Sequence, residues 1–97
     1  MATLEFRRID PEANCFRRYR LTDRPNLFGG IDLIAEWGRI GWRSRSKVES
    51  FETPDALARR RAELLGTRRR RGYELVAVTE DSSHPASLER VVRALLG

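Results

Sequence analysis

The most constraining feature of the sequence is the alternation of side-chain types over residues 31–37, IDLIAEW. Every odd-numbered position is apolar, and the positions between them are acidic with one exception. A period of two is typical of a β-strand with one face on an apolar core. Gly38 and Gly41 follow directly and indicate a turn or bulge. The sequence therefore predicts a strand over 31–37, with residues 42–51 returning as its partner strand.

Three other short segments have the composition of β-strands, namely residues 4–9, 15–21 and 73–78. The first two are separated by DPEAN, whose Asp, Pro and Asn residues favour a chain reversal. The Pro- and Gly-containing segment 22–30 has the character of a loop. Together with 31–37 and 42–51, these segments predict a protein rich in strands joined by turns.

One long helix is predicted after the partner strand. Thr53 offers a hydroxyl cap, Pro54 stands where its missing N–H does no harm, and Asp55 faces the positive end of the helix dipole. The helix is expected to run to about Arg71 and to stop at Gly72.

Arg61 falls in the middle of the apolar face of this helix. That face is formed by Leu57, Ala58, Ala62, Leu64 and Leu65. A charge there can extend past the helix edge into solvent, or it can pair with an acid across the interface. The sequence leaves both interpretations open.

A second amphipathic helix is predicted near the end of the chain, after the connector EDSSHP. Its apolar residues recur at helical spacing and are Leu88, Val91, Val92, Leu95 and Leu96. A chain of 97 residues supports one core and not two. We therefore interpret residues 1–79 as the domain and residues 80–97 as a connector and helix packed on the same domain.

The charge balance favours an anionic partner. Lys and Arg number 19 against 14 acidic residues, which gives a net charge of +5, and all the basic residues but Lys47 are arginine. Arginine holds its charge at physiological pH and forks onto phosphate or carboxylate. Because arginine richness can also reflect the codon bias of a GC-rich genome, the positions of the arginines have to decide.

The sequence contains no apolar run of signal-peptide length and none that could span a membrane. Cys15 is the only cysteine, which excludes a disulfide within the chain. A cytoplasmic protein without membrane contact is the expectation.

The order of these elements and the string WGRIG at residues 37–41 resemble the WGR domain family, named for this tripeptide. The family occurs in poly(ADP-ribose) polymerases, in a bacterial molybdate-metabolism regulator and as small stand-alone bacterial proteins. Phe51 before a helix that opens with an acid and alanine, and the sequence Arg71-Gly72-Tyr73 at the end of that helix, match as well. The resemblance covers roughly residues 3–79 and implies an α+β fold, an antiparallel sheet with the long helix packed on one face.

Two segments depart from the family pattern. The family often has a glycine and a glutamine a few residues after WGRIG, where this chain has residues 42–45, WRSR. An aromatic residue that often fills the first half of the helix core has no counterpart, and residues 59–61 are arginines. Both departures add charge or bulk and bear on the fit to a partner.

In the polymerases the WGR domain contacts DNA at strand breaks, and its motif tryptophan stacks at the end of a strand. The resemblance carries this role to Trp37, whose indole could equally belong to the core. Trp42, which has no family counterpart, is a second candidate for stacking. Arg39 matches an arginine that acts at interdomain contacts in those enzymes. In this chain it can bind phosphate or brace the turn by bonding backbone carbonyls.

Two further groups of basic residues are candidates for binding nucleic-acid phosphates. Arg43, Arg45 and Lys47 alternate along the expected partner strand, so their side chains should leave one face about 6–7 Å apart. A charged edge strand can also serve only to prevent edge-to-edge pairing. Residues 68–71, namely Arg68, Arg69, Arg70 and Arg71, stand at a helix C-terminus, and four cations exceed what capping requires.

Catalysis is not expected. His84 is the only histidine and lies in a connector, Cys15 has no basic partner nearby in sequence, and no phosphate loop or metal-ligand cluster is present. We therefore expect a non-catalytic nucleic-acid-binding module without cofactor or metal, with DNA favoured over RNA. The alternative is a protein-interaction module that uses the WGR surface or the C-terminal helix, and the sequence does not indicate an oligomeric state.

Overall fold

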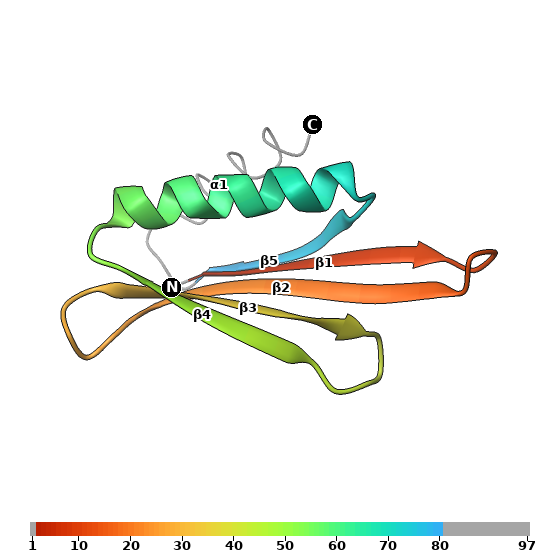
Figure 1. The fold of residues 1–97 in the computed structure, drawn as a ribbon, viewed down its shortest axis with the longest axis horizontal. Helices are drawn as coiled ribbons and strands as arrows, with labels where there is room; N and C mark the ends of the chain where they lie inside the picture. The colour runs from red at the N-terminus through yellow and green to blue at the C-terminus, as the bar shows by residue number, and fades with distance from the viewer. Residues whose placement is uncertain (1, 81–97) are drawn as a thin grey trace.

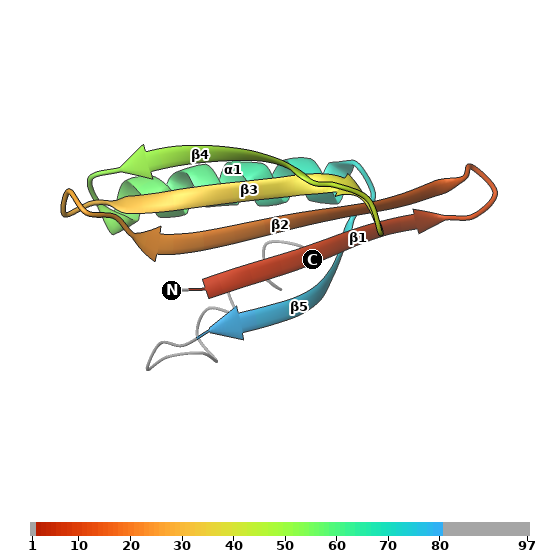
Figure 2. The same cartoon turned by 90° about the horizontal axis from the view of Figure 1, so that it is seen from below.

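The computed structural model describes residues 2–80, which form a five-stranded antiparallel sheet with one helix packed on a face (Figure 1). The elements are β1 (Ala2–Asp10), β2 (Cys15–Pro25), β3 (Ile31–Arg39), β4 (Arg45–Phe51), α1 (Pro54–Arg70) and β5 (Glu74–Glu80). Their order across the sheet is β4-β3-β2-β1-β5. Viewed from below, β4 and β5 are the two edge strands, and α1 lies behind the sheet (Figure 2). The α+β architecture expected from the sequence is confirmed.

The register of the strands places the core on the face that carries α1. Leu4 pairs with Leu21, and Leu21 pairs with Ala35, so these side chains form one row across three strands. Phe6 and Tyr19 form the next row. Laterally paired residues share a face of the sheet, and the buried core consists of Leu4, Phe6, Tyr19, Leu21, Leu33, Ala35, Leu57 and Leu65.

The helix begins and ends as the sequence predicts. The Thr53 hydroxyl accepts a hydrogen bond from the Ala56 N–H at 3.2 Å, with Pro54 in the first turn. At the other end Gly72 adopts a φ of 82°, and the Tyr73 N–H returns to the Arg68 carbonyl at 3.0 Å. A left-handed residue after the last turn is favourable for glycine, and it redirects the chain into β5.

Arg61 pairs with an acid across the helix–sheet interface. Its Nη1 lies 3.8 Å from Oδ1 of Asp23 on β2, and the Asp23 carboxylate also accepts the Ala2 N–H at 2.9 Å. The second of the two interpretations left open by the sequence is therefore correct. Because this acid lies in a strand 38 positions earlier in the sequence, no local pattern could identify it.

The largest difference from the expected strands lies in the segment after the glycines. The partner strand was expected over residues 42–51, but β4 begins only at Arg45. Residues 42–44 belong to the loop, because Trp37 already pairs with Arg45 at the end of the ladder. The other strands extend one to four residues beyond their expected ends. The predicted C-terminal amphipathic helix lies outside the described residues.

Candidate nucleic-acid interface

Two glycines allow the β3–β4 loop to fold back over the end of β3. The Trp42 N–H donates to the Arg39 carbonyl at 3.0 Å and closes a turn in which Gly41 has a φ of 85°. A Cβ on Gly38 would lie 3.0 Å from the Arg43 carbonyl oxygen. Any larger residue at position 38 would thus push the loop away from the strand.

Arg18 of β2 holds this loop in place. Its Nη2 donates to the Trp42 carbonyl at 3.2 Å and to the Ser44 hydroxyl. Arg18 pairs with Gly38 in the sheet. Because Gly38 has no side chain, it leaves space next to the side chain of Arg18. This role could not be predicted from the sequence, because Arg18 is one of many arginines in a strand and no spacing links it to residues 42–44.

The loop forms one wall of a cleft of about 460 Å³, which we name the arginine cleft. Within the part of the chain that the structure describes, four arginines line it, together with aromatic side chains and one amide, and no acidic residue does. Its lining residues are Asn14, Phe16, Arg17, Trp37, Gly38, Arg39, Trp42, Arg43, Arg45 and Tyr73. The cleft therefore brings together both tryptophans and three of the predicted basic residues, and it adds Arg17, Phe16 and Tyr73.

The two tryptophans occupy different environments. Trp37 is half-buried, packs against the core and still lines the arginine cleft. Trp42 is 70% exposed at the tip of the loop. Trp37 is therefore neither a fully exposed platform nor a fully buried core residue. Its side chain contacts both the core and the arginine cleft.

Arg39 contacts the neighbouring β1–β2 turn. Its guanidinium lies over the Phe16 ring, 5.5 Å from the ring centroid, and its Nη2 donates to Oδ1 of Asn14 at 3.3 Å. Bonds to backbone carbonyls of its own turn, one of the two roles that the sequence leaves open, are absent within residues 2–80. The neighbouring hairpin of β1 and β2 provides the partners of Arg39 instead. Arg39 remains exposed and lines the arginine cleft.

Arg43, Arg45 and Lys47 do not form one row. Arg45 pairs with Trp37 and Lys47 pairs with Ala35, so both lie on the face that carries α1. Arg43 precedes β4 and belongs to the loop, which removes it from the alternation of the strand. Arg43 and Arg45 still line the arginine cleft, whereas Lys47 lines a second hollow between α1 and the sheet. The expectation of a single face holds for Arg45 and Lys47 and is wrong for Arg43.

A second hollow lies between α1 and the sheet, with a volume of about 340 Å³, and we name it the helix cavity. Its lining residues are Arg8, Arg17, Tyr19, Leu33, Ala35, Trp37, Lys47, Glu49, Arg60, Leu64, Arg68, Arg71 and Tyr73. It shares Arg17, Trp37 and Tyr73 with the arginine cleft, so the two hollows adjoin one another.

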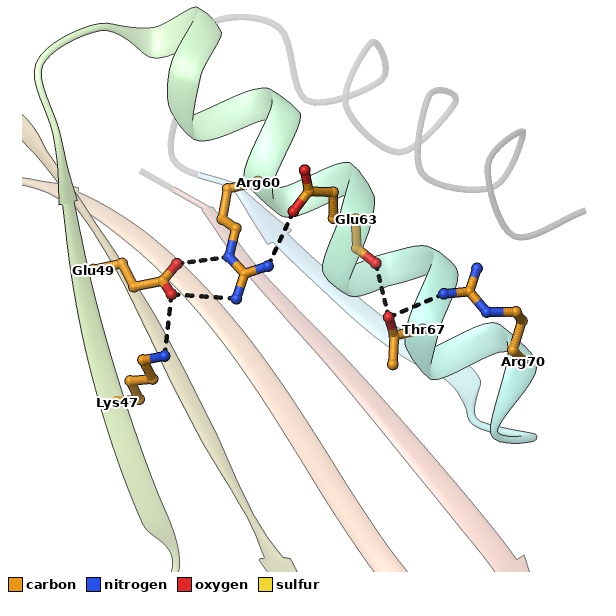
Figure 3. Close-up of polar contacts among 6 residues, drawn as sticks. All are labelled: Lys47, Glu49, Arg60, Glu63, Thr67 and Arg70. Atoms are coloured by element: carbon orange, nitrogen blue, oxygen red, sulfur yellow. Dashed lines mark hydrogen bonds and ion pairs between the residues drawn. The ribbon is translucent and has the colours of Figure 1, made fainter.

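A cluster of charges joins α1 to β4 at the side of the helix cavity (Figure 3). Arg60 donates to both carboxylate oxygens of Glu49, at 2.8 and 3.2 Å, and to Glu63 at 3.0 Å. The Lys47 ammonium lies 3.3 Å from the same Glu49 carboxylate. The hydrogen bonds from Arg60 hold the pKa of Glu49 below its ordinary value, and the bonds to Glu49 and Glu63 raise the pKa of Arg60. Glu49 is therefore ionised, and its charge is already compensated.

Among the four arginines at the end of α1, Arg68 is directed inward and the other three are exposed. The Arg68 guanidinium lies 4.3 Å from the Tyr19 ring centroid and 5.2 Å from that of Tyr73. Arg69, Arg70 and Arg71 are exposed, and Arg70 donates to the Thr67 hydroxyl (Figure 3). Arg68 therefore does not share the solvent exposure of the other three, because the two tyrosines give its guanidinium a cation–π site inside the interface.

Burial also affects the tyrosine below Arg68. Tyr19 is only 4% exposed, and this desolvation raises the pKa of its phenol even though Arg68 acts in the opposite direction. The phenol is thus neutral.

Within the described part of the chain, no group of three or more His, Cys, Asp or Glu side chains could hold a metal ion, and α1 is neither long nor apolar enough to cross a membrane.

Comparisons with known proteins extend over the same residues. The family model of the WGR domain matches residues 2–80. An uncharacterized protein of Sinorhizobium fredii, y4dW, is 37% identical over 82 residues, which are 84% of this chain and 40% of that protein. The chain thus spans about two fifths of the length of this relative. No solved structure matches the chain.

Proposed function

Because this chain belongs to the WGR domain family, whose members are generally non-catalytic nucleic-acid-binding modules, we propose that it binds DNA at ends, nicks or breaks. The arginine cleft carries the proposal. It places four arginines and two tryptophans around one hollow, and none of the described residues that line it is acidic. Phosphates supply most of the affinity of such contacts, and an indole offers a stacking surface to any terminal base or sugar.

We expect the binding to show little sequence preference. Arginines that contact phosphates fix the position of the nucleic acid without reading it, whereas sequence is read by polar contacts to base edges. Asn14 is the only amide among the residues of the arginine cleft that the structure describes, and its Oδ1 already accepts a hydrogen bond from Arg39. The cleft therefore favours the backbone and the end of a strand over a particular base.

The proposal is tested by titration against blunt-ended, nicked, circular and single-stranded DNA and against RNA, each at two salt concentrations. If four to six phosphates are neutralised, the slope of log affinity against log salt should be roughly −3 to −5. Blunt-ended and nicked DNA should bind more tightly than circular DNA. A flat salt response contradicts DNA binding and favours a protein partner, and equal affinity for circular and blunt-ended DNA contradicts recognition of ends.

A pair of matched variants assigns the binding to the cleft. Arg45→Gln removes one charge from the arginine cleft, and it should weaken binding to every DNA and reduce the salt slope by about 1. Arg24→Gln removes the same charge from the other end of β2, seven residues beyond Arg17 and thus about 23 Å away along the strand. This control should leave both affinity and slope close to those of the unchanged protein. Equal losses in both variants would mean that only the net charge matters.

A further inference from the structure

The helix cavity has the size and lining of a small-molecule site. Its volume of about 340 Å³ falls in the range of roughly 300–1,000 Å³ that is common for ligand pockets. Tyr19, Leu33 and Ala35 form a buried apolar floor. Trp37 and Tyr73 add aromatic surface at the side that adjoins the arginine cleft. The cavity can therefore take a flat, largely apolar group that enters from the cleft.

The charges around this floor favour an anion. Among the described residues that line the helix cavity, Glu49 is the only acid, and it is already bound by Arg60 and Lys47. Arg8, Arg17 and Arg71 also line the cavity, and none of these three lies within ion-pair distance of a carboxylate among residues 2–79. A flat apolar group with an attached anion thus matches both parts of the lining.

The inward side chain of Arg68 adds a polar group to this lining. Its Nε is buried and has no hydrogen-bond partner within the described residues, an arrangement that is unfavourable for folding. An apolar residue at position 68 would fill the same interface without that cost. The guanidinium instead lies between Tyr19 and Tyr73 and adds positive charge to the cavity.

We propose that the helix cavity binds one unpaired nucleotide, with the base against the apolar floor and the rings of Trp37 and Tyr73, and with the phosphate at Arg8, Arg17 and Arg71. The proposal rests on the proposed function. The two hollows adjoin at the residues that they share, so the end of a strand held in the arginine cleft can reach the helix cavity. A free nucleoside monophosphate and an unpaired nucleotide at a strand end have the same chemistry. A nick, gap or frayed end supplies such a nucleotide, whereas an intact duplex does not.

The first experiment uses deoxyadenosine monophosphate as the probe, with titration followed by calorimetry or NMR. The monophosphate should bind more tightly than deoxyadenosine and more tightly than inorganic phosphate, because it alone satisfies both parts of the cavity. Binding of inorganic phosphate with equal affinity would overturn the proposal, since it would show an anion site without a base site. No binding of the monophosphate would overturn it as well.

Two pairs of variants locate the site. Leu64→Phe fills the cavity from the α1 side, while Ala58→Phe adds the same ring on an exposed part of the helix. Arg8→Gln removes a cavity charge, while Arg7→Gln removes the adjacent charge on the opposite face of β1. The monophosphate affinity should fall roughly tenfold in Leu64→Phe and Arg8→Gln, as for the loss of a stacked base or a charge-assisted contact. Equal losses in the control variants would contradict the assignment.

A second experiment distinguishes binding in the helix cavity from binding in the arginine cleft. It also distinguishes an unpaired nucleotide of DNA from a free nucleotide as the ligand. A fluorescent base, 2-aminopurine, is placed unpaired in a one-nucleotide flap or paired within the duplex. Binding of the unchanged protein should alter the fluorescence of the unpaired base, and Arg8→Gln should abolish this change while leaving the salt slope of duplex binding in place. A salt-dependent duplex affinity without any fluorescence change would overturn the cavity proposal and leave the proposed function intact. Loss of all DNA binding would overturn the proposed function, and monophosphate binding would then point to a free nucleotide.

Discussion

Trp37 has two roles that one substitution can measure separately. The indole packs against the core and also lines the arginine cleft, so Trp37→Ala should affect both stability and binding. We expect binding to DNA ends to weaken by roughly 1–3 kcal/mol, as for other stacked bases. The loss in unfolding free energy should stay below the roughly 3–5 kcal/mol of a fully buried tryptophan. Titrations with blunt-ended and circular DNA, together with thermal melts of the same variant, provide the two values.

If that variant loses stability but binds DNA ends normally, Trp37 serves the core alone. Trp42→Ala is the matched comparison, because Trp42 is exposed and its removal should leave stability nearly unchanged. A Trp42→Ala variant that melts earlier would contradict its assignment to the solvent side.

The arginines at the end of α1 should differ in how much each contributes to the free energy of unfolding. Arg68→Gln removes a guanidinium held over Tyr19 and Tyr73, and should lower the unfolding free energy by roughly 0.5–2 kcal/mol. Arg69→Gln removes an exposed charge, and should leave the free energy of unfolding within about 0.5 kcal/mol. Chemical denaturation of both variants checks this difference. Equal stabilities would mean that the contact with the tyrosines contributes nothing to folding.

At the level of the elements, the β3–β4 loop depends on a brace from β2. Arg18→Lys keeps the charge but loses the planar fork that reaches both the Trp42 carbonyl and the Ser44 hydroxyl. We expect faster amide hydrogen exchange over residues 41–45 and weaker DNA binding, with little change in the exchange of β1. Unchanged exchange in the loop would show that the turn at Gly41 is sufficient to hold it.

The contact between α1 and β4 should make part of the stability depend on pH. Arg60 holds the pKa of Glu49 below its ordinary value of 4.5, so the folded state favours the ionised carboxylate. This contribution is fully present above the unfolded pKa and is lost as pH falls through the lower folded pKa. Glu49→Gln should therefore reduce stability at neutral pH, by about 1 kcal/mol or less for a partly exposed pair, and flatten the stability profile below pH 4.5. Denaturation curves over that range measure the difference.

For the molecule as a whole, one helix is narrower than the sheet. Five strands span about 19 Å between the outer strand axes, whereas a helix is about 10 Å wide, and α1 contacts β3 and β4. That residues 80–97 pack on the same domain stays a prediction. Removal of residues 81–97 should lower the melting temperature and increase the binding of a dye specific for exposed apolar surface. An unchanged melting temperature would contradict that packing and favour a separate role for the apolar stripe.

Much of the element order could be predicted because its signals are local. The strand over residues 31–37, the cap at Thr53 and the stop at Gly72 each depend on neighbours within a few positions, and all three are confirmed. The start of β4 could not be predicted. It depends on how tightly the chain turns after Gly38, and the contact of residue 38 with the Arg43 carbonyl exists only in the folded loop.

The candidate site divides in the same way. The sequence by itself determined that Trp37 and Arg39 end a strand and that glycines shape the turn beside them, because side-chain alternation and backbone freedom act along the chain. Only the tertiary structure decided that Arg18 braces the loop, that Arg17 joins the cleft and that Arg68 turns inward. These contacts depend on strand register and on which face α1 covers, and both are set by packing between segments that are distant in the sequence.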